Sequence, residues 1–235
     1  FGEKMLKFYY NTGPNPMKVA LCLEEMGLAY QAIPVDTRKG EQHAPSYMQI
    51  NPNAKAPSIE DDGHVVFDSN AILLYLAEKT GTFITDSSPK SRADLLSWLM
   101  FVATGIGPYS GQSVHFQHMA PEKIKYAINR YVYEAERHYD ILNNRLSNNK
   151  YMLGDTYSIV DMCVWGWARM LPKVIGEGEL EKRTHLNRLM TEINNRPASK
   201  KAMEISSSNN HNFKVEIDEE ASKFMFPQNE RLKNI

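Results

Sequence analysis

Cysteine is nearly absent from this sequence, and its scarcity excludes several kinds of protein. Only Cys22 and Cys163 occur among the 235 residues, and neither belongs to a Cys-x-x-Cys pair or to a zinc-ligand spacing. A disulfide scaffold and a cysteine-based structural zinc site are therefore excluded. Two scattered cysteines are typical of a reducing compartment, so a cytoplasmic location is expected.

Long apolar runs and an excess of charge of one sign are also missing. No stretch approaches the roughly 18–20 apolar residues that span a bilayer, and the first residues lack a signal-peptide pattern. Lys and Arg total 27 and Asp and Glu total 28, which gives a net charge of −1. This balance provides no electrostatic attraction to nucleic acid or to an anionic membrane, so neither is an expected partner.

The sequence does contain a mixed α/β pattern over residues 5–84. Short apolar runs predict four strands, at residues 6–10, 30–35, 56–59 and 65–67. Apolar residues at helical spacing predict a helix between the first two strands, closed by Gly27. A further helix is predicted from Asp68 to Gly81, with only a weak helix at residues 37–47. The predicted order is β-α-β-(α)-β-β-α.

After a linker at residues 86–89 the pattern changes to helices. Four apolar or amphipathic stretches predict them, at residues 92–103, 121–147, 162–171 and 184–195. Ser158 and Asp161 have the spacing of a helix capping box ahead of the third stretch. The predicted organisation is an α/β domain, an all-α helical bundle and an extended tail, at residues 5–84, 90–205 and 206–235. Three phenylalanines are able to dock this tail: Phe213, Phe224 and Phe226.

The turn from the first strand into the first helix is a place where such a domain can hold a reactive sulfur. A helix N-terminus offers unpaired N–H groups and the positive end of the helix dipole, which together stabilise a thiolate. No cysteine lies in this turn, and Cys22 lies two turns into the helix on the buried stripe, which indicates a core residue. Any sulfur handled at this turn must therefore arrive on a ligand.

Thr12 and Asn15 are the side chains of this turn that can donate to such a sulfur. The alternative is that Asn15 only caps the helix, with Pro16 at the first helical position, and that Thr12 only decorates the turn. Tyr9 or Tyr10 is a further donor, and only one of them can reach the site because adjacent strand residues face opposite sides.

Two further segments suit a peptide-like ligand. If the Ala56–Pro57 bond is cis, Ala56 turns its N–H and C=O outward, where a peptide can pair with them; most such bonds are trans. Asp68 and Ser69 begin the last helix of the α/β part, where they can accept from an ammonium and donate to a carboxylate. The alternative for this pair is again a helix cap.

Together these segments resemble the glutathione transferase superfamily, and most closely its bacterial Nu-class branch, which is related to the yeast prion-forming nitrogen regulator. In the α/β part the matching motifs lie at residues 12–16, 39–42, 51–57 and 68–76. In the helical part they lie at residues 105–108, 126–131 and 154–161. The resemblance covers about residues 5–205, and the order and spacing of its short motifs are specific only when taken jointly.

The resemblance implies a thioredoxin-like N-terminal domain, an all-α C-terminal domain and glutathione as cosubstrate between them. Asn15 is expected beside the glutathione sulfur as a catalytic residue, with Thr12 as a second donor. The rest of the tripeptide is expected to contact Gln42, Lys55, Ala56, Pro57, Asp68, Ser69 and Arg137. The chain departs from its close relatives at Gly13, where they have Thr.

Within that set the resemblance also implies which end of glutathione each position meets. Gln42 matches a residue at the glycyl end, and Ala56, before a cis proline, matches the one that pairs with the cysteinyl backbone. Asp68 and Ser69 match the pair that holds the γ-glutamyl group.

Aromatic residues of the helical part are candidates for a second-substrate pocket, namely Tyr109, His115 and Phe116. His115 and His118 can share one helical face, but no third metal ligand lies near them in sequence, so no metal is expected. The two tryptophans Trp165 and Trp167 are more typical of core packing.

The implied function is that of a glutathione transferase-like enzyme that activates the glutathione thiol. The Nu-class resemblance implies glutathione-dependent disulfide reductase activity, with weak conjugation of glutathione to small electrophiles. The alternative is a non-catalytic glutathione-binding regulator. The family also implies a homodimer.

Overall fold

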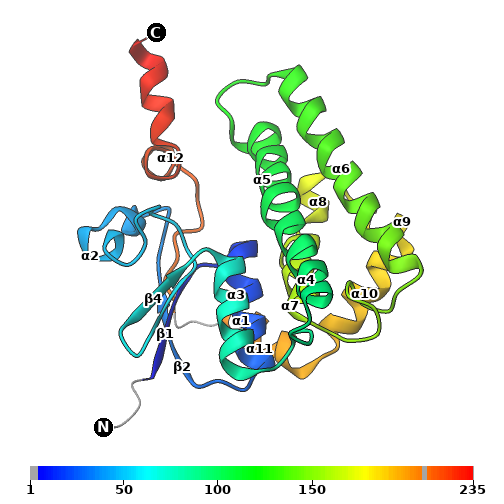
Figure 1. Ribbon diagram of the computed structural model, residues 1–235. Coiled ribbons are helices and arrows are strands. Elements are labelled where there is room, and N and C mark those ends of the chain that lie inside the picture. Colours follow the sequence, from blue (N-terminus) through cyan, green and yellow to red (C-terminus); the bar gives the residue numbers. More distant parts are fainter. Residues whose placement is uncertain (1–4, 208–210, 235) are drawn as a thin grey trace. The chain divides into compact units, whose positions relative to one another are not determined.

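The computed structural model describes residues 5–207 and 211–234, which form two compact units. The first unit contains residues 1–72 and 201–235, and the second contains residues 73–200. The polypeptide therefore returns to its first unit after completing the second. Figure 1 shows the elements along the chain.

The first unit is built on a four-stranded sheet whose strands are β1 (Leu6–Tyr10), β2 (Tyr30–Pro34), β3 (Ser58–Asp61) and β4 (His64–Phe67), in the order β2-β1-β3-β4. β1 pairs in parallel with β2 and antiparallel with β3, so that Phe8 lies opposite both Ala32 and Ile59. β3 and β4 form the antiparallel hairpin that the turn at residues 61–63 predicts. All four predicted strands are confirmed.

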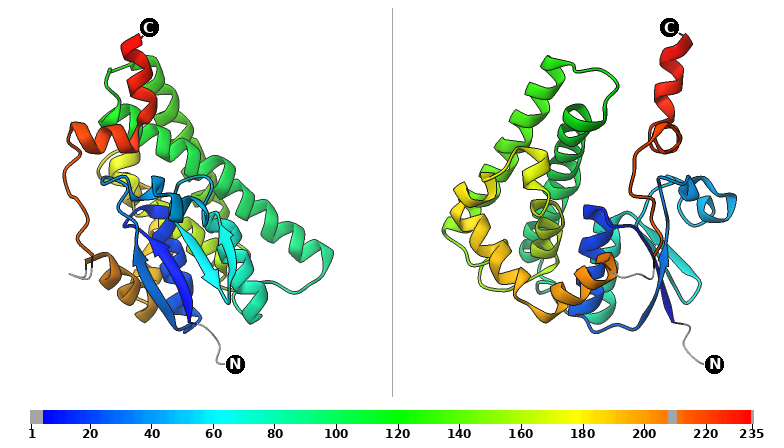
Figure 2. Two further views of the ribbon diagram at one scale, coloured as in Figure 1. Left: turned by 90° about the vertical axis from the view of Figure 1, so that its left-hand side faces the viewer. Right: turned by 180° about the vertical axis from the view of Figure 1, so that it is seen from behind.

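Helices cover both sides of this sheet. α1 (Pro14–Glu25) packs on one face, while η1 (Glu41–His43) and α2 (Pro45–Met48) lie on the other side (Figure 2). The run from Pro16 to Leu23 is buried and forms much of the core with Phe8 and Ile59. On the opposite face Tyr9 packs against Tyr47, with ring centroids 5.7 Å apart.

α1 begins earlier than the sequence predicts, and this changes the role of Asn15. The N-cap is Gly13, in extended backbone with φ −70° and ψ 166°, and no side chain caps the helix. Pro14 takes the first helical position, which its fixed φ favours. Asn15 therefore lies inside the first turn, and the expectation that it caps the helix is wrong.

Helical structure also appears in the tail, which the sequence predicts to be extended. α11 (Pro197–Ser207) precedes it, residues 211–218 are irregular, and α12 (Glu219–Met225) and η4 (Pro227–Asn234) follow. Asp218 starts α12, because its Oδ1 accepts a hydrogen bond from the backbone N–H of Ala221 at 2.8 Å. The three-phenylalanine docking expected for this segment involves at least Phe213 and Phe224, as described below.

The second unit is helical, as predicted. Its elements are α4 (Pro89–Phe101), η2 (Val102–Ile106), α5 (Gly107–Val114), η3 (His115–Met119), α6 (Lys125–Ser147), α7 (Ile159–Ala168), α8 (Leu171–Val174), α9 (Glu179–Lys182) and α10 (Thr184–Asn194). η2 and η3 are π-helical turns. α3 (Ser69–Thr80) starts in the first unit and ends in the second.

Two details of this unit test the sequence patterns. α6 begins at Lys125 rather than at Pro121, because Pro121 restricts Ala120 to extended backbone and Ile124 is extended too. The capping box of α7 is confirmed. Ser158 Oγ accepts a hydrogen bond from the backbone N–H of Val160, and the Asp161 carboxylate accepts one from the backbone N–H of Ser158. Every residue of α7 is buried.

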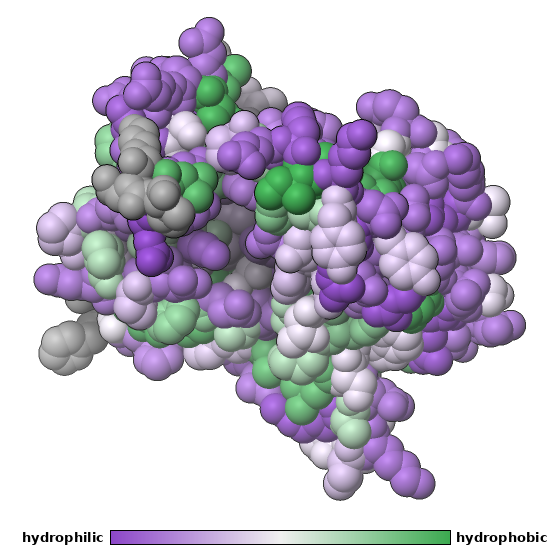
Figure 3. All heavy atoms as spheres, turned by 90° about the horizontal axis from the view of Figure 1, so that it is seen from above, coloured by the Kyte–Doolittle hydropathy of each residue, from purple (hydrophilic) through white to green (hydrophobic). Residues whose placement is uncertain are grey.

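Polar residues cover most of the face seen in Figure 3, and hydrophobic residues lie among them in small groups. No helix in the described part of the chain is long and apolar enough to cross a membrane. Across the same residues, no group of three or more His, Cys, Asp or Glu side chains is arranged to hold a metal ion.

Candidate functional site

The turn between β1 and α1 is shaped by Asn11. Its Oδ1 accepts a hydrogen bond from the backbone N–H of Gly13 at 2.9 Å, which folds the chain back before the helix begins. Thr12 is exposed and Asn15 is half-buried in the first turn of α1. No acidic side chain lies in that turn, so the positive end of the helix dipole is available to an anion.

Gly13 is part of the same arrangement. A Cβ built on Gly13 would lie 2.9 Å from Asn11 Oδ1, closer than real Cβ atoms come, so a side chain there would displace the asparagine. A side chain at position 13 would therefore require Asn11 to move. Sequence reasoning missed Asn11, although an Asn two residues before a glycine is a recognised turn signal.

Asp68 holds the start of α3 in an unusual conformation. Its Oδ1 accepts from the backbone N–H groups of Asn70 and Ala71 at 2.9 and 3.1 Å, so the capping alternative is correct as far as it goes. However, Asp68 has φ 70°, where an ordinary cap has extended backbone. A left-handed residue other than glycine costs about 1–3 kcal/mol and such residues cluster at functional sites. Its carboxylate is exposed and Ser69 beside it is buried.

Lys18 links α1 to the start of α3. Its side chain is 2% exposed, and its Nζ donates to Asn70 Oδ1 at 2.5 Å. The buried Lys18 side chain, one turn into α1, therefore meets α3 at Asn70, two residues after Asp68. Sequence reasoning missed this contact; the available signal was a lysine inside a run of otherwise apolar buried residues.

The segment before β3 confirms the predicted cis peptide bond between Ala56 and Pro57. The carbonyl of Lys55 accepts two hydrogen bonds, from Tyr47 Oη at 2.7 Å and from Asn51 Nδ2 at 2.6 Å. The pairing of β3 with its neighbours starts only at Ser58, so Ala56 lies outside the ladder. Lys55 is exposed and Ala56 is half-buried, while α2 and the residues after it hold the Lys55 carbonyl.

Gln42 lies in η1 and is buried, with 4% of its surface exposed. Its Nε2 donates to the carbonyls of Thr37 and Phe224, each at 3.2 Å. Its Oε1 is buried and has no hydrogen-bond partner within the described residues. The predicted glycyl-end residue is thus engaged by the tail of its own chain.

The remaining predicted residues lie in the second unit. Phe116 stacks on Tyr131 with ring centroids 5.3 Å apart and contacts His115 at 5.2 Å. The ring centroids of Tyr109 and Tyr131 lie 6.3 Å apart. The three second-substrate candidates therefore form one aromatic cluster around Tyr131. Burial lowers the pKa of His115, which keeps its imidazole neutral at neutral pH.

Arg137 does not join this cluster, because its guanidinium donates to Glu134 Oε2 at 3.0 and 3.1 Å. The predicted residues are therefore divided between the two units. The first unit holds those at the starts of α1 and α3, in η1 and around the cis proline. The second unit holds the aromatic cluster and Arg137.

Two family models match this chain. The model of the glutathione S-transferase N-terminal domain matches residues 4–78, and that of the glutathione S-transferase C-terminal domain matches residues 100–197. These ranges cover more than half of the 235 residues. The chain belongs to the glutathione S-transferase family, and its thioredoxin-like domain with a helical domain is the fold that the resemblance implies.

Three individual relatives show how similar this chain is to known proteins. The disulfide-bond oxidoreductase YfcG of Escherichia coli strain K12 is 45% identical over 170 residues, which is 69% of this chain and 79% of YfcG. The disulfide-bond oxidoreductase YghU of the same strain is 36% identical over 224 residues, which is 88% of this chain and 77% of YghU. A solved glutathione transferase family member from Pseudomonas fluorescens pf-5, with two glutathione bound, has a TM-score of 0.80 at 33% identity and covers 85% of this chain and 92% of its own.

Proposed function

We propose that this protein is a glutathione-dependent disulfide-bond reductase that also conjugates glutathione weakly to small electrophiles. The proposal rests chiefly on one observation. The start of α1 favours a thiolate and presents Asn15, whereas both cysteine side chains of the chain are fully buried elsewhere, in α1 and α7. The reacting sulfur must therefore belong to a ligand. The relatives named as disulfide-bond oxidoreductases, and the one with two glutathione bound, support the choice of reaction.

Binding of glutathione would use several predicted segments of the first unit. Asp68 accepts from the γ-glutamyl ammonium, while Ser69 and the N-terminus of α3 donate to the carboxylate beside it. Ala56 pairs with the cysteinyl backbone, and its neighbours Lys55 and Pro57 flank the ligand. The glycyl end meets Gln42, and Arg137 is a further contact that the family resemblance implies.

Activation of the thiol would use Asn15 and the dipole of α1. A hydrogen bond to the thiolate and the dipole together contribute about 1–3 kcal/mol, and 1.4 kcal/mol lowers a pKa by about one unit. This is enough to bring a thiol of pKa about 8.5 toward neutral pH. Thr12 supplies a second donor. Both side chains stabilise the anion without taking up its proton, which leaves to solvent.

The reduction then proceeds in two exchanges. The glutathione thiolate attacks one sulfur of the substrate disulfide, forming a mixed disulfide and releasing the other sulfur as a thiolate that takes up a proton. A second glutathione thiolate attacks the glutathione sulfur of that mixed disulfide. The products are glutathione disulfide and two substrate thiols, so two glutathiones supply the two electrons. The aromatic cluster of Tyr109, His115 and Phe116 would contact the second substrate.

A steady-state assay tests this proposal. The full chain is incubated with glutathione and bis(2-hydroxyethyl) disulfide, and glutathione disulfide and free thiol are measured separately. We expect one glutathione disulfide for every disulfide reduced. Tight binding of glutathione without turnover at any pH would instead support the regulatory alternative. Conjugation alone, with no disulfide turnover, would limit the function to transfer.

We also place this activity in a cytoplasmic homodimer. The support is the family, together with exposed aromatic residues on α6: Tyr126 is 76% exposed and Tyr133 is 60% exposed, seven residues apart and so on one side of the helix. Sedimentation at micromolar concentration tests the dimer. A monomer at the concentration of the activity assay would contradict it.

A further inference from the structure

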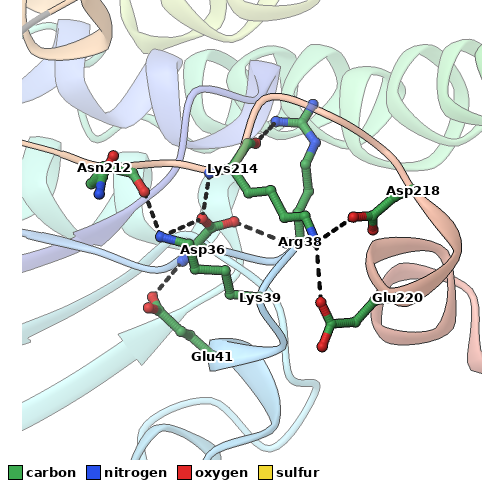
Figure 4. A network of polar contacts seen from close by, with 8 residues as sticks. All are labelled: Asp36, Arg38, Lys39, Glu41, Asn212, Lys214, Asp218 and Glu220. Carbon is green, nitrogen blue, oxygen red and sulfur yellow. Dashed lines mark hydrogen bonds and ion pairs between the residues drawn. The ribbon is translucent and has the colours of Figure 1, made fainter.

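The tail crosses the loop that follows β2 and is bound there by main-chain contacts. We call residues 211–226 the tail strap. The backbone N–H of Lys214 donates to Asp36 Oδ2 at 2.6 Å, and the Lys214 carbonyl accepts from Arg38 Nη1 at 2.8 Å. Lys39 Nζ donates to the carbonyl of Asn212 at 2.5 Å. Figure 4 shows these contacts from close by, with the loop residues converging on the strap.

Aromatic packing adds to these polar contacts at both ends of the strap. Phe213 packs edge-on against Tyr10 of β1, with centroids 5.9 Å apart. The ring of Phe224 lies directly on Gly40, where an added Cβ would come within 2.6 Å of the ring. Gly40 also has φ 80°, so this position suits glycine for both its conformation and its close approach. The strap therefore packs closely against the loop.

Gln42 is the residue at which the strap and the candidate glycyl site coincide. A glutamine amide has two N–H donors, and here one points to Thr37 O and the other to Phe224 O. His43 Nε2 also lies 3.0 Å from the Phe224 carbonyl. With the strap in place, Gln42 has no N–H left to offer a carboxylate. What remains is its Oε1, a buried acceptor that has no hydrogen to donate to an anion.

Some polar atoms at the contact between strap and loop are unsatisfied, which offsets part of the cost of releasing the strap. Three of the buried polar atoms that lack a hydrogen-bond partner among the described residues lie at this contact: Arg38 Nε, Gln42 Oε1 and His211 Nδ1. Buried unpaired groups lose the hydrogen bonds that water would give them, and lifting the strap would return water to them. The strap also keeps contacts of its own, since Lys214 Nζ pairs with Asp218 at 2.8 Å and with Glu220 at 3.2 Å, so it does not depend wholly on the loop (Figure 4).

We propose that the tail strap is a gate at the glycyl end of the thiol site, and that the strap and the glycyl carboxylate of glutathione compete for Gln42. This inference rests on the proposed function, because it takes Gln42 as a glycyl-binding residue. The gate weakens glutathione selectively. A thiol that lacks the glycyl residue, γ-glutamylcysteine, has no group to place at Gln42 and is indifferent to the strap. Thermodynamic linkage requires that glutathione loosen the strap by the same factor.

Calorimetry with the full chain tests the gate. The strap variant carries Phe213→Ala and Phe224→Ala, and the control carries Val215→Ala, a strap residue that is 86% exposed. Each protein is titrated with glutathione and with γ-glutamylcysteine. We expect the strap variant to bind glutathione at least about fivefold more tightly than wild type, the lower end of common coupling factors, with γ-glutamylcysteine and the control unchanged.

The results that would contradict the gate can be distinguished from one another. Weaker or unchanged glutathione binding in a folded strap variant would overturn the gate and leave the proposed function standing. An equal gain for both thiols would overturn it too, because the effect would not arise at the glycyl end. Failure of wild type and variants to bind either thiol would overturn the proposed function, and the gate with it.

Hydrogen exchange on the unmodified protein provides a second measurement that does not depend on the variant folding. The Lys214 amide is protected by Asp36 when the strap is seated. Saturating glutathione is expected to speed exchange across residues 212–226, whereas saturating γ-glutamylcysteine leaves it unchanged. Equal protection in both complexes would overturn the gate.

Discussion

Asn15 occupies a position in which catalysis and helix capping are separable. It lies in the first turn of α1, whereas the cap position belongs to Gly13, which makes no side-chain hydrogen bond. A substitution at Asn15 therefore leaves the capping of α1 as it is. Its half-buried side chain lies in the first turn, at the positive end of the helix dipole.

We expect Asn15→Ala to lower turnover at neutral pH and to raise the apparent pKa of bound glutathione by about one unit, since the hydrogen bond is one part of the roughly 1–3 kcal/mol that it and the dipole supply together. The pH–rate profile measures this shift, and the melting temperature should stay close to that of wild type. Thr12→Val is the matched comparison. If Asn15→Ala keeps full activity and Thr12→Val loses it, the catalytic donor is Thr12.

Asp68 unites two roles that substitution can distinguish. Asp68→Asn keeps an Oδ1 acceptor for the N–H groups of Asn70 and Ala71, and Asn tolerates the positive φ of this position. It removes the charge that would pair with an ammonium. We expect glutathione binding to weaken by about 30- to 150-fold, corresponding to 2–3 kcal/mol, with little change in melting temperature.

A matched control for this test lies in the β3–β4 turn. Asp62 is also an exposed aspartate in left-handed backbone, with φ 50°, so Asp62→Asn reproduces the chemical change away from α3. Calorimetry should show wild-type affinity for this variant. Equal affinities for both variants would mean that Asp68 is only a cap, and that the ammonium lies elsewhere.

At this scale the sequence predicted what local chemistry decides. The Asp68–Ser69 helix start and the Ser158 capping box were predicted from their local sequence and are present. The cis Ala56–Pro57 bond is present too, but only the family resemblance implied it, because most such bonds are trans. The start of α1 was not predicted, because the first four N–H groups of a helix are unpaired and a proline is tolerated at more than one of these positions. Pro16 therefore does not mark where this helix begins.

Helix α7 shows how a single buried group governs an element. Asp161 accepts from the backbone N–H groups of Met152 and Ser158 at 2.8 and 2.9 Å, yet it is completely buried. Burial outweighs these hydrogen bonds and raises its pKa from 3.8 to about 6. The folded state therefore binds this proton more tightly than the unfolded state does.

The sign of the resulting pH dependence follows from the raised pKa. The stabilisation from the protonated carboxyl is fully present below pH 3.8 and is lost as the pH rises through about 6. Asp161→Asn cannot titrate. We expect the difference in unfolding free energy between wild type and this variant to fall by on the order of 3 kcal/mol between pH 3.5 and pH 6.5. Urea titrations across this range measure it, and a difference that rises with pH would show that the ionised form is the stabilising one.

Elements whose conformation depends on tertiary contacts were predicted less well. The π-helical turns η2 and η3 join α4 and α5 to their neighbours with no break in apolar pattern, so periodicity did not reveal them. α12 has only seven residues, too few to be stable on propensity alone. It is positioned by Phe224 on Gly40, a contact that no local pattern indicates.

The arrangement of the whole molecule was predictable where motifs recur in a fixed order, and unpredictable where distant segments meet without one. The sheet order and the helical second unit follow the resemblance over residues 5–205. The tail strap lies outside it, and the contact between Gln42 and Phe224 joins residues 182 positions apart. The sequence indicated that Phe224 can dock the tail, but no pattern indicated that its carbonyl would meet Gln42.

Whether the protein or glutathione supplies the reacting sulfur concerns the whole molecule. Each unit contains one cysteine, Cys22 in α1 and Cys163 in α7, and both are fully buried, so neither is accessible to a substrate disulfide. If the sulfur chemistry belongs entirely to glutathione, neither thiol is needed. A Cys22→Ala, Cys163→Ser double variant should therefore keep its disulfide reductase activity within about twofold, at a cost of about 1–3 kcal/mol in stability from altered core packing and a buried hydroxyl.

The assay for this variant is run well below its melting temperature, so that unfolding does not imitate a loss of chemistry. Circular dichroism establishes the folded fraction, and initial rates are compared at saturating glutathione. A protein thiol that formed the mixed disulfide would be indispensable, and its removal would abolish turnover at any glutathione concentration. A folded double variant without activity would therefore mean that the nucleophile is a thiol of the protein and not the thiol of glutathione. The stoichiometry of two glutathiones per disulfide would then have to arise by regeneration of that thiol rather than by direct attack.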